Sequence, residues 1–348
     1  MSLIPEPTAT TAKAIDAYHE SKKEKPRPHM GVSLLGHPCD RWLWLSFRWA
    51  IQEDFPGRIL RLFRRGHHEE NWIVQDLRAI GVHIRATGGK QSRVEFGSHV
   101  SGSLDGIIEE GLIESPNKLH VAEFKTHSDK SFKDLLKHGV EKSKPMHYVQ
   151  MMVYCYGMKI DRAFYLAVNK NTDEIYTERL KLNREVAEKY IKRGQTIALT
   201  DIMPHPVSTD PSWYQCGYCP AKSFCHQKEP TKHVNCRTCA HSTALEDNTW
   251  ACELHRSGAI PLEFQHTGCD SHVLHPHLVP WKMDQEKTTN DIAAWIIDGK
   301  TVLNGAYSQD VYTSAEILAN PVACASGEMR PFREAFGAKV IADERVLP

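Results

Sequence analysis

The sequence predicts a mixed α/β fold in which a sheet is flanked by helices. Segments with helical periodicity and segments with strand-like alternation follow one another in the order α-β-β-β-α-β, which is typical of this class. The chain has 348 residues, of which 41% are apolar and 25% are charged. This length and balance fit a globular protein with one sizeable core and smaller modules.

The first predicted elements are helices. Residues 1–30 form a polar arm with a helix over residues 11–23, after which two prolines break the pattern. From residue 31 the chain is rich in aromatic residues, and a long helix is predicted over residues 58–80, with Gly81 as its C-terminal cap. Its apolar residues recur at helical spacing, and they are Leu62, Ile73, Leu77 and Ile80.

The sheet is predicted from alternating segments separated by turn residues. The remaining elements are, in order, strands over residues 92–96, 104–109 and 119–125, a helix over 145–156 that Gly157 stops, strands over 163–168 and 174–180, and a helix over 184–199.

Charge and hydropathy exclude little and point to no partner. The 43 basic residues equal the 43 acidic ones, so net charge gives no sign of nucleic acid binding, and any basic path must be local. No apolar run approaches the roughly 20 residues that span a bilayer, so no membrane partner is expected. The polar N-terminus lacks an apolar signal core, and we therefore expect a cytoplasmic protein.

An acidic and a basic side chain share one face of the third predicted strand. Because side chains alternate along a strand, Glu123 and Lys125 point one way and Phe124 points to the core. Asp105 lies opposite them if the preceding strand pairs with this one. Two carboxylates about 4 Å apart repel by about 4 kcal/mol at an effective dielectric constant of about 20.

A hard divalent cation relieves such repulsion, which points to Mg²⁺ or Mn²⁺. A bound metal lowers the pKa of a water molecule and stabilises charge on a phosphate, while Lys125 can orient the attacking water. The alternative is a surface hairpin with an ordinary Glu/Lys pair, since such triplets are common.

The surrounding motifs resemble the RecB-type branch of the PD-(D/E)xK nucleases. The features that carry the resemblance are a Gly-small-Leu-Asp-Gly turn into a strand, the Glu-x-Lys strand, and Gln150 and Tyr154 one helical turn apart. The resemblance covers about residues 31–228, and Leu104 stands where the family nominally has proline. It implies a restriction-endonuclease-like mixed sheet and a metal-dependent DNA nuclease centred on Asp105, Glu123 and Lys125. It also implies that the Gln-x-x-x-Tyr helix supports the site and contacts DNA.

The same branch carries a carboxylate or histidine on its first helix, typically four residues after a glycine. Gly66 is followed by two histidines and two glutamates, and the spacing selects Glu70, with Glu69 as the alternative. A solvated pair of glutamates also fits the sequence. The arginines of this helix recur at a spacing that could follow a phosphate backbone or only solvate the helix, and they are Arg58, Arg61, Arg64 and Arg65.

Eight of the ten cysteines stand at spacings typical of metal ligands, and only Cys155 and Cys324 stand apart. The first set has one cysteine upstream and three in a C-x₂-C-x₅-C pattern, and it consists of Cys39, Cys216, Cys219 and Cys225. Thiolates suit both iron–sulfur clusters and zinc. The pattern resembles the iron–sulfur staple of the CRISPR-associated four-cysteine exonucleases and related phage exonucleases, which implies a [4Fe–4S] cluster.

The second set has the pattern C-x₂-C-x₁₂-C-x₁₆-C and consists of Cys236, Cys239, Cys252 and Cys269. Four thiols at this spacing predict a Zn²⁺ site like that of a zinc ribbon. One of three histidines could replace a ligand, and these are His241, His255 and His272.

Together these features predict four parts: a polar arm over residues 1–30, a nuclease domain closed by an iron–sulfur staple over 31–228, a zinc module over 229–280, and an α+β segment of unknown role over 281–348. The predicted function is that of an exonuclease that resects DNA ends in phage recombination or replication within a bacterial host. Its substrate would be duplex or single-stranded DNA with an end, and its protein partner a recombination or single-strand-annealing protein. An endonuclease, a CRISPR spacer-trimming enzyme and a catalytically silent DNA clamp are the alternatives.

Overall fold

The computed structural model describes residues 10–22 and 24–336. The rest of the predicted polar arm and of the C-terminal segment lies outside the described residues. The chain forms two compact units, each assembled from several stretches. The first comprises Met1–His37, Glu53–Phe96 and Val100–Gly194, and the second comprises Pro38–Gln52, Gly97–His99 and Gln195–Pro348.

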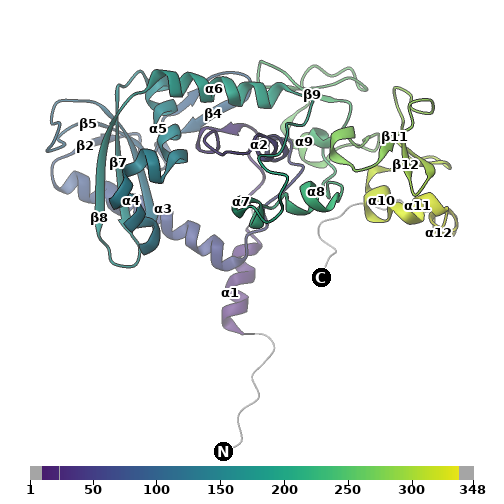
Figure 1. Cartoon of the computed structure of the whole chain (residues 1–348), viewed down its shortest axis with the longest axis horizontal. Helices are drawn as coiled ribbons and strands as arrows, with labels where there is room; N and C mark the ends of the chain where they lie inside the picture. Colours follow the sequence, from purple (N-terminus) through teal and green to yellow (C-terminus); the bar gives the residue numbers. More distant parts are fainter. Residues whose placement is uncertain (1–9, 23, 337–348) are drawn as a thin grey trace, which may run out of the picture. The chain divides into compact units, whose positions relative to one another are not determined.

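A five-stranded mixed sheet is the centre of the first unit (Figure 1). Its strands lie in the order β2 (His83–Arg85), β5 (Gly106–Glu110), β6 (His120–His127), β7 (Arg162–Asn169) and β8 (Ile175–Lys181). Only β6 and β7 pair in parallel, and the other pairs are antiparallel. A parallel pair needs a crossover connection, which here consists of α4 (Asp129–Ser143) and α5 (Pro145–Met158).

The two faces of β6 have different environments. Ala122 and Phe124 point toward α3 (Gly57–Ala79), whose buried residues Ile73 and Leu77 pack into the same core. On the opposite face of β6, which carries Glu123, α4 and α5 contact the sheet. Alternation along one strand therefore separates an apolar core from a polar face.

The first unit also holds a three-stranded sheet, in the order β1 (Met30–Gly31), β4 (Val100–Ser103) and β3 (Arg93–Glu95). Its remaining helical elements are α1 (Thr11–Glu20), two short 3₁₀ turns, η1 (Val32–Leu34) and η2 (Gly88–Lys90), and α6 (Arg184–Leu199), whose last residues belong to the second unit.

The second unit consists of short elements. These are α2 (Asp40–Phe47), α7 (Tyr214–Gly217), α8 (Lys222–Gln227), η3 (Cys236–Thr238), the β9 (Ser242–Ala244) and β10 (Trp250–Cys252) hairpin, α9 (Leu262–Thr267) and η4 (Pro276–Leu278). A four-stranded sheet follows, with β11 (Lys282–Met283), β12 (Ala293–Ile297), β13 (Lys300–Asn304) and β14 (Val311–Tyr312) in that order. Three helices close the described chain: α10 (Ser314–Ala319), α11 (Pro321–Ser326) and α12 (Met329–Phe336).

The predicted mixed α/β class is confirmed, and most predicted elements are present. Gly81 has a φ of +88° just after α3, the backbone conformation that a glycine cap supplies. The predicted stop at Gly157 is wrong, because α5 continues through it. A Cβ at this position would lie 2.8 Å from both Phe96 and Val94, so the glycine allows close packing instead.

Helix α4 and strand β4 are among the elements that were not predicted. Helix α4 buries only Phe132, Leu135 and Val140 and is otherwise mostly polar, which hides its periodicity. Strand β4 is short and contains Gly102, a residue that weakens a strand signal. The division into four parts stays a prediction. No helix within residues 10–22 and 24–336 is long and apolar enough to cross a membrane.

Candidate active site

The pairing of β5 with β6 brings Asp105 next to Glu123. Gly106 is opposite Ala122 in this antiparallel pair, so Asp105, one residue before β5, comes opposite Glu123. The Asp105 carboxylate accepts a hydrogen bond from the backbone N–H of Phe124 at 2.9 Å. This bond anchors the loop before β5 to the strand that carries the other two candidate residues.

The carboxylate of Glu123 is fully buried. Its Oε2 accepts a hydrogen bond from Gln150 Nε2 at 3.0 Å. Its Oε1 forms an ion pair with Lys125. Burial raises the pKa of Glu123 to about 8, and Asp105 adds to this effect while Lys125 opposes it.

Lys125 faces both carboxylates. Its Nζ pairs with Glu123, lies 3.7 Å from Asp105 Oδ2, and donates to the backbone carbonyl of Phe124 at 3.1 Å. Burial by itself would lower the pKa of Lys125, but the charges of Glu123 and Asp105 raise it above its ordinary value. The ammonium group therefore stays charged.

A third carboxylate comes from α3. Burial and the proximity of Asp105 raise the pKa of Glu70 to about 7, and Gln91 Nε2 donates a hydrogen bond to Glu70 Oε1 at 3.3 Å. The charge of Glu70 also acts on Glu123. Glu69, the alternative from the sequence, is half-buried on the same helix. The electrostatic coupling to Asp105 favours Glu70.

Helix α5 supplies the two residues of the Gln-x-x-x-Tyr motif. Gln150 is bonded to Glu123, and Tyr154 is buried and interacts with Gln150. Burial raises the pKa of Tyr154, so the phenol stays protonated. A Cβ on Gly102 would lie 2.9 Å from the Tyr154 hydroxyl, and this explains why strand β4, which precedes Asp105, needs a glycine there.

The chemistry of the donor set fits a hard divalent cation. Three carboxyl groups act on one another electrostatically, and the raised pKa values of Glu70 and Glu123 reflect poorly solvated negative charge. Among the residues that the structure describes, however, no group of three or more His, Cys, Asp or Glu side chains is arranged so that it could hold an ion. The fit rests on chemistry and proximity.

Sequence reasoning missed three polar residues beside this site. His127 follows Lys125 at the next same-face position of β6, His147 lies three residues before Gln150 on α5, and Tyr165 is paired with Glu123 across β6 and β7. The two histidine spacings were a readable signal. Tyr165 could be placed only once the parallel register was known.

The arginines of α3 are partly engaged within the protein. Arg61 forms an ion pair with Asp16 of α1, and Arg65 donates to the backbone carbonyl of Lys170 at 3.1 Å. Arg58 and Arg64 are exposed. These two are therefore the better candidates for a phosphate contact.

The first cysteine set gathers within the second unit. Its four members line one hollow: Cys39, Cys216, Cys219 and Cys225. Cys39 caps α2, since its Sγ accepts the backbone N–H of Trp42 at 3.4 Å. Burial and then the other cysteines raise the pKa of Cys219, to about 11. Four thiols around one space are a donor set that fits a thiolate-bound metal or cluster.

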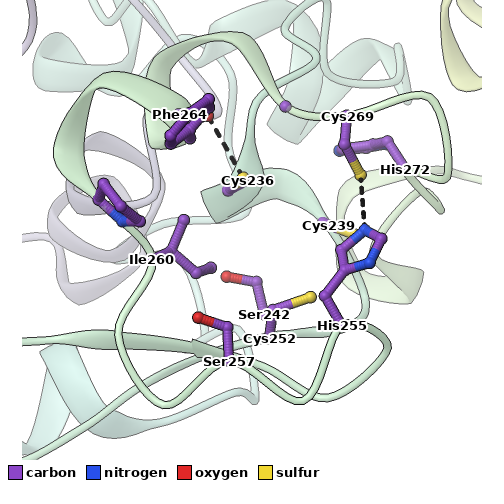
Figure 2. Close-up of a pocket in the computed structure, with 12 residues that line it drawn as sticks. Cys236, Cys239, Ser242, Cys252, His255, Ser257, Ile260, Phe264, Cys269 and His272 are labelled. Atoms are coloured by element: carbon purple, nitrogen blue, oxygen red, sulfur yellow. Dashed lines mark hydrogen bonds between the residues drawn. The ribbon is translucent and has the colours of Figure 1, made fainter.

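The second cysteine set surrounds a separate hollow, shown in Figure 2. The four thiols are those of Cys236, Cys239, Cys252 and Cys269. Burial raises the pKa of Cys236 to about 12, and the three other thiols add to the effect. Thiols that raise one another's pKa in this way would be relieved by a cation, which fits zinc.

The three histidines that could replace a cysteine ligand have different environments in the structure. His272 is buried and both ring nitrogens are engaged, Nδ1 with Ser314 and Nε2 with Thr238. His255 Nε2 lies 3.5 Å from the Cys269 Sγ at the edge of the hollow, as Figure 2 shows. His241 does not line this hollow. His255 is therefore the candidate replacement.

The fold and the site together define a class, that of nucleases with carboxylates and a lysine on adjacent strands of a mixed sheet. The chain belongs to the PD-(D/E)XK nuclease superfamily, whose family model matches residues 18–226. No curated protein matches the chain.

Several solved structures are similar in part. The protein SSO0001 is 13% identical with a TM-score of 0.39, over 62% of this chain and 96% of that one. The alkaline exonuclease LHK-Exo from Laribacter hongkongensis is 12% identical with a TM-score of 0.37, over 49% and 87%. A phage-related exonuclease from Haemophilus somnus 129PT is 17% identical with a TM-score of 0.26, over 37% and 65%. These TM-scores are low, and the likenesses add nothing to the family assignment.

Proposed function

We propose that this protein is a Mg²⁺- or Mn²⁺-dependent deoxyribonuclease that hydrolyses phosphodiester bonds. The observation that carries the proposal is the fully buried carboxylate of Glu123, which has one oxygen held by Gln150 and the other facing Lys125. Burying an ionised carboxylate is costly unless it is paired, hydrogen-bonded or bound to a metal, and such groups cluster at functional sites. Asp105 and Glu70 complete the set of oxygen donors.

Each residue has a distinct task in this proposal. Asp105 and Glu123 would hold the metal, with Glu70 as a third carboxylate. When bound, the metal supplies a water of lowered pKa and stabilises negative charge on the phosphate. Lys125 stays protonated, so it can donate a hydrogen bond to the attacking water or to a phosphate oxygen. Gln150 fixes the orientation of Glu123 by holding Oε2.

The proposed substrate is DNA with an end, as duplex or single strand, which an exonuclease would resect in phage recombination or replication in the bacterial cytoplasm. A recombination or single-strand-annealing protein is the proposed partner. The exposed Arg58 and Arg64 offer two contacts to a phosphate backbone. An endonuclease, a CRISPR trimming enzyme or a silent clamp could present the same residues, so the test must separate them.

The deciding experiment compares end-labelled linear DNA with covalently closed circular DNA, in EDTA, Mg²⁺ and Mn²⁺. The proposal expects metal-dependent loss of the linear substrate, progressing from its ends, while the closed circle survives. Cutting of the closed circle would identify an endonuclease instead. Binding without any cleavage, by a protein that retains Asp105, would identify a clamp.

We further propose a [4Fe–4S] cluster at the first cysteine set and Zn²⁺ at the second. What supports this is that each set of four thiols lines a common hollow within the second unit. Both centres would be structural, since metal binding contributes folding free energy. In this proposal the cluster closes the nuclease domain over residues 31–228, and the zinc module spans residues 229–280 of the sequence.

Metal analysis of the wild type and two cysteine variants tests these assignments. Wild-type protein prepared without oxygen should be brown and contain both iron and zinc. Cys216→Ser should lose the colour and keep zinc, whereas Cys236→Ser should lose zinc. Colourless wild-type protein with two zinc ions and no iron would contradict the cluster assignment.

A further inference from the structure

A second polar group lies beside the candidate active site on the same face of the sheet. Side chains alternate along a strand, so Glu123, Lys125 and His127 of β6 share one face. Tyr165 of the parallel neighbour β7 is in register with Glu123, which puts its side chain on that face too. The charge of Glu123 acts on the Tyr165 phenol, as expected for direct neighbours.

The phenol of Tyr165 joins two imidazoles. Its oxygen is 2.8 Å from His127 Nε2 and 2.9 Å from His147 Nδ1, and Ser131 Oγ is 3.2 Å from His127 Nδ1. A hydroxyl can donate one hydrogen bond and accept others. The Tyr165 hydroxyl can therefore donate a hydrogen bond to one imidazole and accept one from the N–H of the other. Both imidazoles can then be neutral, with one ring proton each.

Both imidazoles are neutral at neutral pH. Burial lowers the pKa of His127 to about 4 and that of His147 to about 3, and nearby lysines, Lys125 among them, lower both further. Neutral rings add no positive charge next to Lys125. The group is thus a hydrogen-bonded tie and leaves the charge balance of the carboxylates unchanged.

The tie connects the sheet to α5, the helix that holds Glu123. His147, Gln150 and Tyr154 lie at positions i, i+3 and i+7, which form one stripe on a helix. Gln150 bonds to Glu123 in β6, and His147 bonds to Tyr165 in β7. The His147–Tyr165 bond lies one helical turn before the Gln150–Glu123 bond. It therefore restrains the part of α5 that carries Gln150.

We propose that Tyr165, His127 and His147 are positioning residues that hold α5 at the depth from which Gln150 orients the Glu123 carboxylate. The proposal rests on the nuclease function proposed above and extends the Gln-x-x-x-Tyr motif by one turn, to His-x-x-Gln-x-x-x-Tyr. Without the tie, α5 can shift, the Gln150–Glu123 bond lengthens, and Glu123 Oε2 loses the donor that fixes the carboxylate. A misplacement of about 1 Å at a reacting centre can cost about 100-fold in rate.

The test replaces Tyr165 with phenylalanine, which removes the hydroxyl and keeps the ring. Tyr176→Phe is the matched control, because Tyr176 lies on β8 and its hydroxyl donates to Glu178 at 2.7 Å, outside the tie. The readouts are kcat and KM on linear DNA, the Mn²⁺ concentration that gives half-maximal activity, and the melting temperature.

The expected result for Tyr165→Phe is a kcat lowered about 10- to 100-fold with KM for DNA unchanged, together with a higher Mn²⁺ requirement. Tyr176→Phe should keep the wild-type kcat and Mn²⁺ requirement. If the hydroxyl of Tyr165 only stabilises the fold, Tyr165→Phe should have a lower melting temperature. Its kcat, measured well below that temperature, should then equal the wild-type kcat. That outcome overturns the proposal.

A second pair of variants decides the matter if Tyr165→Phe does not fold. His147→Asn keeps a donor near the position of Nδ1, whereas His147→Ala removes it. The proposal expects Asn to retain most of the kcat that Ala loses, and equal activities of the two would overturn it. Wild-type protein that cleaves no DNA would instead refute the nuclease function itself, so the two failures are distinguishable.

Discussion

At the scale of single residues, the site concentrates negative charge where water solvates it poorly. The pKa of Glu123 rises from 4.5 to about 8 chiefly because the carboxyl is buried, and that of Glu70 rises to about 7 for the same reason. Each shift means that the folded protein holds a proton that the unfolded chain releases. Folding therefore disfavours the charged form of both groups in the absence of a cation.

The pH dependence of stability follows from the sign of these shifts. Below about pH 4.5 the Glu123 carboxyl is protonated in both the folded and the unfolded state, so its burial does not lower the free energy of unfolding. Between pH 4.5 and about 8 only the unfolded chain loses the proton. The free energy of unfolding therefore falls as the pH rises through this range. We expect Glu123→Gln in EDTA to be more stable than the wild type, by a margin that grows from pH 5 to pH 8. Melting temperatures of both proteins across this range measure it.

The same measurement contains its control. Mn²⁺ should raise the wild-type melting temperature most at pH 8 and should do little for Glu123→Gln, because a cation replaces the proton that the folded carboxylate would otherwise need. Parallel pH curves for the two proteins in EDTA would show that Glu123 is not a poorly solvated carboxylate.

Gly102 makes a second residue-scale prediction. A Cβ there would lie 2.9 Å from both the Tyr154 hydroxyl and Val32 Cβ, so alanine must displace one of them. We expect Gly102→Ala to cost about 1–3 kcal/mol of stability and to lower cleavage by disturbing Tyr154. Gly66→Ala on α3 is the control, because nothing lies within 4 Å of its Cβ. It should be stabilising by about 0.5–1 kcal/mol, as urea denaturation would report.

At the scale of elements, both ends of α2 in the second unit contact residues of the cysteine sets or of the turn between their members. Cys39 of the first set caps its N-terminus. At its other end, Arg237, from the turn between Cys236 and Cys239, donates to the carbonyl of Phe47 at 2.9 Å and lies 3.8 Å from the centre of the Trp49 ring. The second set therefore braces the helix that carries a member of the first.

Replacing Arg237 tests this bracing. Arg237→Met keeps the apolar stem but loses the hydrogen bonds and the contact of the charge with the Trp49 ring, at an expected cost of about 2–4 kcal/mol. Amides of residues 40–47 should exchange hydrogen faster, and Cys39 should react faster with a thiol reagent. Arg256→Met, at an exposed position of the same module, should stay within about 0.5 kcal/mol of the wild type. Unchanged exchange in α2 would refute the bracing.

At the scale of the whole molecule, local sequence patterns predicted many of the helices and strands of the first unit. Helix α6 begins and ends where its periodicity placed it, and the alternation in β6 correctly put Glu123 and Lys125 on one face. The pairing of Asp105 with them was conditional on the register of two strands. The structure supplies that register, through Gly106 opposite Ala122.

What escaped prediction depends on contacts distant in sequence. Tyr165 could not be assigned from its strand alone, because only the parallel register with β6 brings it to Glu123. Gly157 looked like a helix stop, since its role in close packing against Phe96 is visible only in three dimensions. Arg61 was one candidate for a phosphate contact or for a solvated helix face, but Asp16 of α1 forms an ion pair with it. Local propensity yields to tertiary contacts in each case.

In the proposed function, Glu123 and its neighbours form a metal-dependent DNA-cleaving centre. The most direct test is the single-turnover cleavage rate of linear DNA in Mn²⁺, measured for the wild type and for Glu123→Gln, with DNA affinity determined in Ca²⁺ on the same preparations. Glutamine keeps the shape of the buried side chain and removes its charge. We expect Glu123→Gln to bind DNA like the wild type and to cleave at least about 100-fold more slowly. Cleavage by Glu123→Gln at the wild-type rate would refute the role of Glu123 in this centre.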